Sequence, residues 1–246
     1  MSNRLHLIAE AATPDNAREP GDQTGIELRA RFFAPDKRGW VEIYRCTDDD
    51  MREKIARFME EAVSNGQIGY SSNTNASGRN SLFRELEAHE NILAKVEPCN
   101  CDCSSLVAQA VRLATGIWFD DGKFESPIVS QYLKYKDTPI VSGVRDFSQY
   151  LDDSIPYEDG YIRKINGIHP GLFEVITRSY ADAFADDSLL QRGDIIRTES
   201  LPELFVRTYK ALAPKDLPEG QIDPDALAKA TALVNDGRDA HIAVYI

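Results

Sequence analysis

The feature that most constrains the fold is an apolar helical stripe that begins directly after a cluster of cysteines. The stripe recurs at three- and four-residue spacing and consists of Leu106, Val107, Ala110, Val111 and Ala114. Such spacing predicts a helix with one apolar face, and Gly116 is placed to end it. Cys103 stands between the preceding polar residues and the stripe, so we expect it at or near the N-terminus of this helix.

Alternating segments on both sides of this helix predict strands. Residues 26–32, 39–45 and 240–246 alternate polar and apolar side chains. In 39–45, Trp40, Glu42 and Tyr44 share one face, which predicts a strand with one buried side. A helix should follow, capped by Thr47 or Asp48 and ended by residues 65–66. Its apolar positions are Met51, Ile55, Phe58, Met59 and Ala62.

The rest of the chain alternates between order and irregularity. A polar loop over residues 70–79 precedes a second helical pattern, which contains Leu82, Phe83 and Leu86 and extends to Ile92 and Leu93. Residues 120–167 mix aromatic side chains with Pro, Gly and Asp and are typical of an irregular insertion. Order returns at 171–177 and 193–197, and a helix is predicted over residues 224–234.

The charge balance and the apolar runs exclude some functional classes. The 246 residues carry 28 Lys and Arg against 40 Asp and Glu, a net charge of −12. This balance argues against nucleic-acid binding, which usually requires a basic face. No run approaches the roughly 18 apolar residues of a membrane span, and residues 1–16 lack a secretory signal. We therefore expect synthesis in the cytoplasm.

Cys103 is the strongest candidate for chemistry. Backbone N–H groups and the positive end of a helix dipole favour a thiolate over a thiol, and the same N–H groups can stabilise an oxyanion. A nucleophile also needs a base. Of His6, His89, His169 and His241, only His241 lies within a predicted strand.

Other interpretations of these residues remain open. A cysteine at the start of an apolar helix can be a small buried hydrophobic residue, and a strand histidine can serve packing alone. The Cys-x-Cys-x-Cys pattern of residues 99–103 could bind zinc or copper(I), although no second Cys or His pair accompanies it. The Arg-Gly-Asp tripeptide at 192–194 is interpreted as a turn into a strand.

Four short motifs, at residues 68–70, 101–107, 190–196 and 240–246, are more specific in combination than any one of them alone. Residues 101–107 read Cys-Asp-Cys-Ser-Ser-Leu-Val, residues 68–70 Ile-Gly-Tyr, residues 190–196 Leu-Gln-Arg-Gly-Asp-Ile-Ile, and residues 240–246 Ala-His-Ile-Ala-Val-Tyr-Ile. They resemble the Asp-Cys-Ser-Gly-Leu-Val, tyrosine, Leu-x-Pro-Gly-Asp-Leu and Gly-His-Val-Gly-Ile-Tyr motifs of the NlpC-like cysteine peptidases. With the segments 21–25, 39–45, 78–82 and 98–105, the chain looks like the phage and prophage peptidoglycan hydrolases of this type.

The resemblance implies an α+β fold of the papain-like NlpC type. In that fold the nucleophile begins a helix that packs on an antiparallel sheet. The chain would form a single domain over residues 1–246, with N-terminal strands or an extension at 1–47. Insertions would occupy residues 120–168 and 198–239.

The resemblance also implies the site. Cys103 would be the nucleophile and His241 the general base, and Tyr70, Ser104 and Asp102 would lie near the oxyanion or the substrate. The expected reaction is hydrolysis of a stem-peptide amide in bacterial peptidoglycan through an acyl-enzyme, with neither a metal nor an organic cofactor. The enzyme would act at the wall after lysis or as part of a virion.

Two departures from the family pattern accompany this assignment. Residues 198–239 separate the Gly-Asp strand from the His241 strand, and the sequence ends five residues after His241. The group that orients the imidazole would then be a side chain from elsewhere, a backbone carbonyl or a water, or would be missing. Cys99 and Cys101 are expected to be neighbours of the site only.

Two other functions are therefore kept as alternatives. One is a structural tail or baseplate protein that keeps the fold without efficient catalysis and binds other phage tail proteins. The other is a bacterial amidase or transferase that acts on a substrate other than peptidoglycan.

Overall fold

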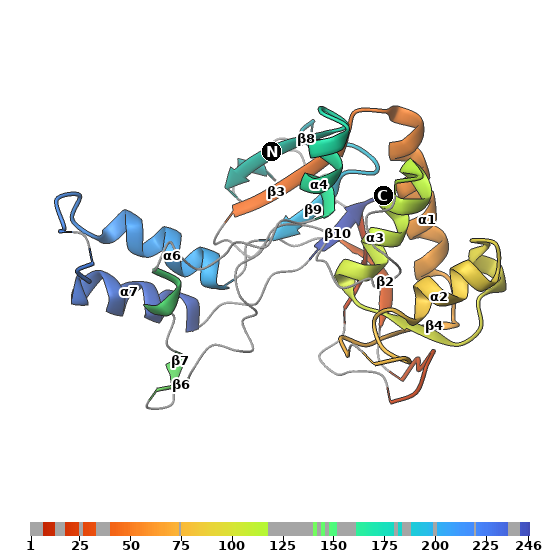
Figure 1. Ribbon diagram of the computed structural model, residues 1–246, viewed down its shortest axis with the longest axis horizontal. Coiled ribbons are helices and arrows are strands. Elements are labelled where there is room, and N and C mark those ends of the chain that lie inside the picture. Colours follow the sequence, from red (N-terminus) through yellow and green to blue (C-terminus); the bar gives the residue numbers. More distant parts are fainter. Residues whose placement is uncertain are drawn as a thin grey trace.

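The computed structural model is an α+β structure with an antiparallel sheet at its centre (Figure 1). This confirms the predicted α+β class, whereas the papain-like type and the division into one domain with insertions stay predictions. The structure describes residues 7–12, 18–24, 27–32, 40–73, 75–117, 140–141, 144–145, 148–151, 161–179, 182–183, 188–198, 201–218, 220–235 and 242–246. His241 and most of the predicted insertion at 120–168 lie outside the described residues.

Six strands form the central sheet in the order β2-β1-β10-β9-β3-β8, and every neighbouring pair is antiparallel. The strands are β1 (Leu7–Ala11), β2 (Leu28–Phe32), β3 (Trp40–Cys46), β8 (Phe173–Ser179), β9 (Ile195–Thr198) and β10 (Ile242–Tyr245). Strands from both ends of the sequence are thus neighbours. The sheet is continuous only because β10 pairs with β1 on one side and with β9 on the other.

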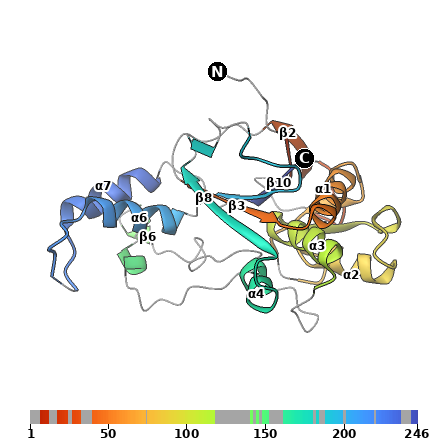
Figure 2. The same ribbon diagram turned by 90° about the horizontal axis from the view of Figure 1, so that it is seen from above.

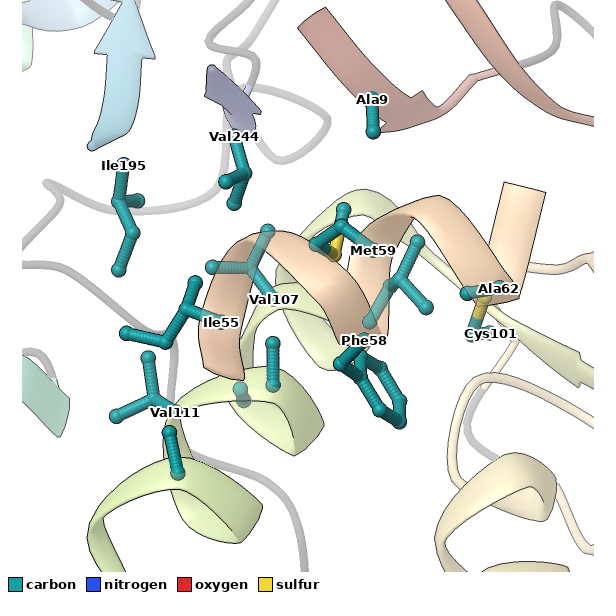
Figure 3. Packing of buried hydrophobic residues seen from close by; sticks show 14 of the residues in the cluster. Ala9, Ile55, Phe58, Met59, Ala62, Cys101, Val107, Val111, Ile195 and Val244 are labelled. Atoms are coloured by element: carbon teal, nitrogen blue, oxygen red, sulfur yellow. The ribbon is translucent and has the colours of Figure 1, made fainter. Parts of the chain in front are cut away.

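Two helices cover one face of the sheet side by side, α1 (Asp49–Val63) and α3 (Cys103–Thr115). Figure 3 shows Ile55 of α1 among Val107 and Val111 of α3, with Val244 and Ile195 of the sheet nearby. The predicted apolar stripes of both helices are buried in this main core. Burial of these stripes is the principal stabilisation of short helices of this kind.

The opposite face of the sheet carries a second apolar cluster. It consists of Ile8, Val41, Ile43, Ala183, Leu190, Ile196 and Ala243. The prediction that β3 has one buried side is therefore wrong. Val41 and Ile43 are buried in this cluster, while Tyr44 is buried in the main core on the other face, because apolar clusters pack on both faces of the sheet.

A short parallel pair, β4 (Ile68–Tyr70) and β5 (Cys99–Cys101), lies outside the main sheet. Helix α2 (Ser81–Ala88) packs against β5, and a 3-10 helix, η1 (Leu93–Lys95), follows α2. The predicted extension of α2 to Ile92 and Leu93 is wrong. The chain turns at Glu90 and Asn91, whose φ angles are 57° and 62°, and these values end the helix.

The remaining elements lie after α3 in the sequence. They are the two-stranded pair β6 (Ile140–Val141) and β7 (Val144–Arg145), the 3-10 helix η3 (Ser148–Leu151), and the helices α4 (Tyr161–Ile168), α6 (Leu201–Leu212) and α7 (Pro224–Asn235). Helices α6 and α7 lie side by side, at the opposite end of the molecule from α1, α2 and α3 in Figures 1 and 2. They share a small apolar core of their own around Phe205 and Ala230.

Candidate active site

The start of α3 is fixed by a capping box. The Asp102 carboxylate accepts a hydrogen bond from the Ser105 backbone N–H at 2.7 Å, and Ser105 Oγ accepts one from the Asp102 N–H at 2.8 Å. This reciprocal arrangement satisfies two backbone donors at a helix end. The first helical bond then runs from the Leu106 N–H to the Asp102 carbonyl at 3.0 Å. Cys103 is therefore the first residue of the helix, as the sequence predicts.

The four cysteines differ in burial. Cys46, Cys99 and Cys101 are fully buried, and Cys103 alone is partly exposed. Burial raises the pKa of the Cys99 thiol to about 12 and that of Cys101 well above its ordinary value. Cys99 and Cys101 therefore keep their protons and pack in the core, and Cys103 is the accessible thiol.

Tyr70 ends β4 and lies beside the start of α3. It pairs with Cys101 in the parallel register, and the Ser71 N–H donates to the Cys101 carbonyl at 2.8 Å. Tyr70 and Cys103 both pack, partly buried, against the main core. Burial, followed by the nearby charges of Cys103 and Asp102, raises the pKa of Tyr70. The phenol therefore keeps its proton and remains a hydrogen-bond donor.

An ion pair that the sequence did not indicate ties Asp102 to the preceding loop. Arg79 Nε lies 3.0 Å from Asp102 Oδ2, without hydrogen-bond alignment, and the two side chains are only 14% and 10% exposed. Asp102 uses Oδ1 for the helix cap and Oδ2 for the arginine. Arg79 thus holds the cap of α3, and its position in the motif at 78–82 is the signal that could have identified it.

Asn100 joins three of the motifs that were noted in the sequence. Its Oδ1 accepts from the Gly21 N–H at 3.2 Å, its Nδ2 donates to the Ser77 carbonyl at 2.7 Å, and its backbone N–H donates to Ser81 Oγ at 2.7 Å. The Gln23 side chain also donates to the Ile68 carbonyl at 2.7 Å. The motifs at 21–25, 68–70, 78–82 and 98–105 therefore meet around β4 and β5, next to Cys103.

The motif at 190–196 has a structural role. Gly193 adopts a φ of 86° in the turn that leads into β9, which confirms the interpretation of residues 192–194 as a turn. The buried Asp194 carboxylate accepts from Arg45 Nε at 2.9 Å and from the Gln191 N–H at 2.8 Å. Its backbone carbonyl accepts from the Tyr245 N–H at 2.9 Å, so the turn anchors the end of β10.

The predicted base, His241, lies immediately before β10. Ala243 belongs to the second apolar cluster, with Tyr245 packed against it, whereas Val244 faces α3 in the main core. His241 itself lies outside the described residues, which resume at Ile242 where β10 begins, so its pairing with Cys103 stays a prediction. Of the other histidines, His89 caps α2 beside Glu85, and His169 is exposed after α4.

The described part of the chain contains no group of three or more Cys, His, Asp or Glu side chains that could hold a metal ion. The cysteines of residues 99–103 are therefore not part of such a group. Nor does any helix over the described ranges combine the length and apolar character needed to cross a bilayer.

Comparison with known proteins identifies the family. Searches of curated proteins and of solved structures found no match. A family model described as an endolysin-like domain matches residues 15–172, which is 158 of the 246 residues and includes Tyr70, Asp102 and Cys103. The matched segment ends before β8, β9, α6, α7 and β10. The chain belongs to the endolysin-like domain family, which makes it a protein of the phage-lysis type that acts on the peptidoglycan of the cell wall.

Proposed function

We propose that the protein is a cysteine hydrolase that cuts amide bonds in the stem peptides of peptidoglycan. The observation that carries this proposal is the position of Cys103. It is the first residue of α3 and the only partly exposed thiol among four cysteines, and it stands beside a protonated tyrosine. The resemblance to NlpC-like peptidases and the helix start against an antiparallel sheet support a papain-like mechanism.

In the proposed reaction, the Cys103 thiolate attacks the carbonyl carbon of the scissile amide and forms a C–S bond. The C–N bond breaks, and the departing amine takes a proton from the imidazolium of His241. Water then attacks the thioester, gives its proton to His241 and displaces the thiolate. One amide and one water thus become a carboxylic acid and an amine.

The residues around Cys103 would stabilise the oxyanion and hold its geometry. The backbone N–H groups at the start of α3 point out of the helix end, where they favour negative charge. The Tyr70 hydroxyl is a second donor, and the partly exposed Ser104 lies next to the nucleophile. Asp102 and Arg79 would be positioning residues, because they fix the first turn of the helix that carries Cys103.

The test is mass spectrometry of purified peptidoglycan after incubation with the wild type, Cys103→Ala or His241→Ala. His169→Ala serves as the matched control, because it removes an exposed histidine that the proposed mechanism does not use. We expect new stem-peptide fragments with the wild type and the control only. Cleavage by Cys103→Ala would refute the thiol mechanism. If no folded sample cleaves the wall, the enzyme hypothesis fails and the structural tail role replaces it.

A further inference from the structure

A cavity of about 300 Å³ lies at the far end of the sheet from α1, between three strands and α6. Its lining comes from β3, β8, β9 and α6 and consists of Trp40, Glu42, Thr177, Arg197, Glu203 and Arg207. The sheet register explains part of this grouping, because Glu42 pairs with Thr177 on one side and with Arg197 on the other. The three side chains form a row across the sheet, and α6 covers it.

The floor of the cavity is a buried and ordered network of charges. Arg197 donates to Glu42 at 3.0 Å and to both carboxylate oxygens of Glu203 at 2.5 Å, and the side chain of Arg197 is only 5% exposed. Tyr44 also donates its hydroxyl to Glu42 at 2.6 Å. Burial alone would lower the pKa of Arg197, but the charges of Glu203 and Glu42 raise it. Arg207 also lines the cavity, so the lining contains two arginines and two glutamates, and their formal charges cancel.

One wall of the cavity is aromatic. Trp40 is 38% exposed at the start of β3, and the guanidinium group of Arg207 lies over its ring at 5.7 Å from the centroid. Thr177, which also lines the cavity, is exposed. The volume lies at the lower end of the range for small-molecule sites, which suits a ligand of about one ring.

We propose that this cavity is a binding site for a neutral pyranose sugar, namely an N-acetylhexosamine of the peptidoglycan glycan strand. The C–H face of a pyranose ring packs on an aromatic side chain, and its hydroxyl groups pair with carboxylate and guanidinium groups that are held in place. Compensated charges disfavour a strongly ionic ligand. The choice of glycan rests on the proposed action on peptidoglycan; the sugar would hold the polymer while Cys103 acts on the peptide.

The test is a fluorescence titration in the background of Cys103→Ala and Trp118→Phe. The first change prevents turnover, and the second leaves Trp40 as the only tryptophan of the two in the chain. The probes are a soluble N-acetylglucosamine oligomer and a free stem tetrapeptide. We expect the oligomer to change the Trp40 emission saturably, and the tetrapeptide to have no effect.

Isothermal titration of Cys103→Ala then identifies the site. We expect Trp40→Ala to weaken oligomer binding at least tenfold. Phe32→Ala, which removes another exposed aromatic ring, should leave it unchanged. Three results overturn the proposal: a folded protein that binds no oligomer, oligomer binding that survives Trp40→Ala, and binding of the tetrapeptide alone at Trp40. Binding is measured without hydrolysis, so failure here is distinct from failure of the thiol mechanism.

Discussion

At the residue scale, the four cysteines show how burial separates a candidate nucleophile from structural thiols. Cys46, Cys99 and Cys101 have no exposed surface, while Cys103 sits at a helix start with part of its surface accessible. Alkylating reagents react with accessible thiolates. The distinction therefore has a direct chemical consequence in the native protein.

We predict that iodoacetamide modifies Cys103 selectively in the folded protein. Peptide mapping by mass spectrometry should find the label on Cys103, and on the other three cysteines only after denaturation, because their burial blocks access. The three buried cysteines are internal controls in the same sample. Equal labelling of Cys99 and Cys103 under native conditions would show that β5 is not buried as described.

The Arg79–Asp102 ion pair should matter for stability. Arg79→Met leaves the Asp102 carboxylate buried without its cation, and loss of one partner of a buried pair costs about 3 kcal/mol. Urea unfolding measures this loss. We expect Asp102→Asn in the Arg79→Met background to recover part of it, because the uncompensated charge is then gone. Additive effects of the two substitutions would mean that the residues do not interact.

At the element scale, the turn before β9 depends on glycine for two reasons. Gly193 has a φ of 86°, and a Cβ atom built there would lie 2.2 Å from the Arg52 carbonyl oxygen of α1. Gly116, which ends α3, also has a positive φ of 69°, but a Cβ there would meet nothing within 4 Å. A side chain would be strained by the positive φ at both positions, but only at Gly193 would its Cβ also clash with a neighbouring atom.

This difference gives a matched pair of substitutions. Gly116→Ala should cost only the conformational penalty of about 1 kcal/mol. Gly193→Ala should cost clearly more, because the turn must move away from Arg52 and β9 and β10 move with it. Thermal or urea unfolding of both variants measures the ranking. Equal losses of stability would contradict the close contact with α1.

The elements also show what the sequence could predict. Helices α1 and α3 were predictable because their apolar stripes are local signals. Asp48, one of the two predicted caps, does cap α1. Asp102 caps α3, a role that the sequence prediction did not assign to it. The prediction did not include α6, although Leu204, Phe205 and Tyr209 recur at helical spacing, and they pack on α7. The parallel pairing of β4 with β5 depends on contacts between distant segments. Local patterns do not contain that information. The Arg79–Asp102 pair was missed for the same reason, since the motif at 78–82 singles out Arg79 but does not name its partner.

At the scale of the whole molecule, the buried thiols couple stability to alkaline pH. The pKa of Cys99 rises from 9.0 to about 12 in the folded protein because the thiol is buried, and those of Cys46 and Cys101 also rise. A thiol that ionises only after unfolding stabilises the unfolded chain as pH increases. The contribution of these groups is therefore complete below about pH 9 and is lost as pH rises towards 12.

We predict that the free energy of unfolding decreases between pH 9 and pH 11. Each thiol contributes up to about 1.4 kcal/mol per pH unit. Urea unfolding at several pH values measures the slope. Cys99→Ala should lower stability at pH 8 and reduce the slope above pH 9, since one ionising group has been removed. An unchanged slope in this variant would show that Cys99 ionises equally in both states.

The central claim is that Cys103 becomes covalently acylated, and the most direct measurement is the mass of that intermediate. The wild type is mixed with a soluble muropeptide, quenched with acid and analysed by intact-protein and peptide mass spectrometry. The account predicts a transient mass gain equal to the acyl half of the substrate, located on Cys103 and absent from Cys103→Ala. Cleavage of the muropeptide with no adduct on Cys103, or cleavage that survives Cys103→Ala, would contradict it.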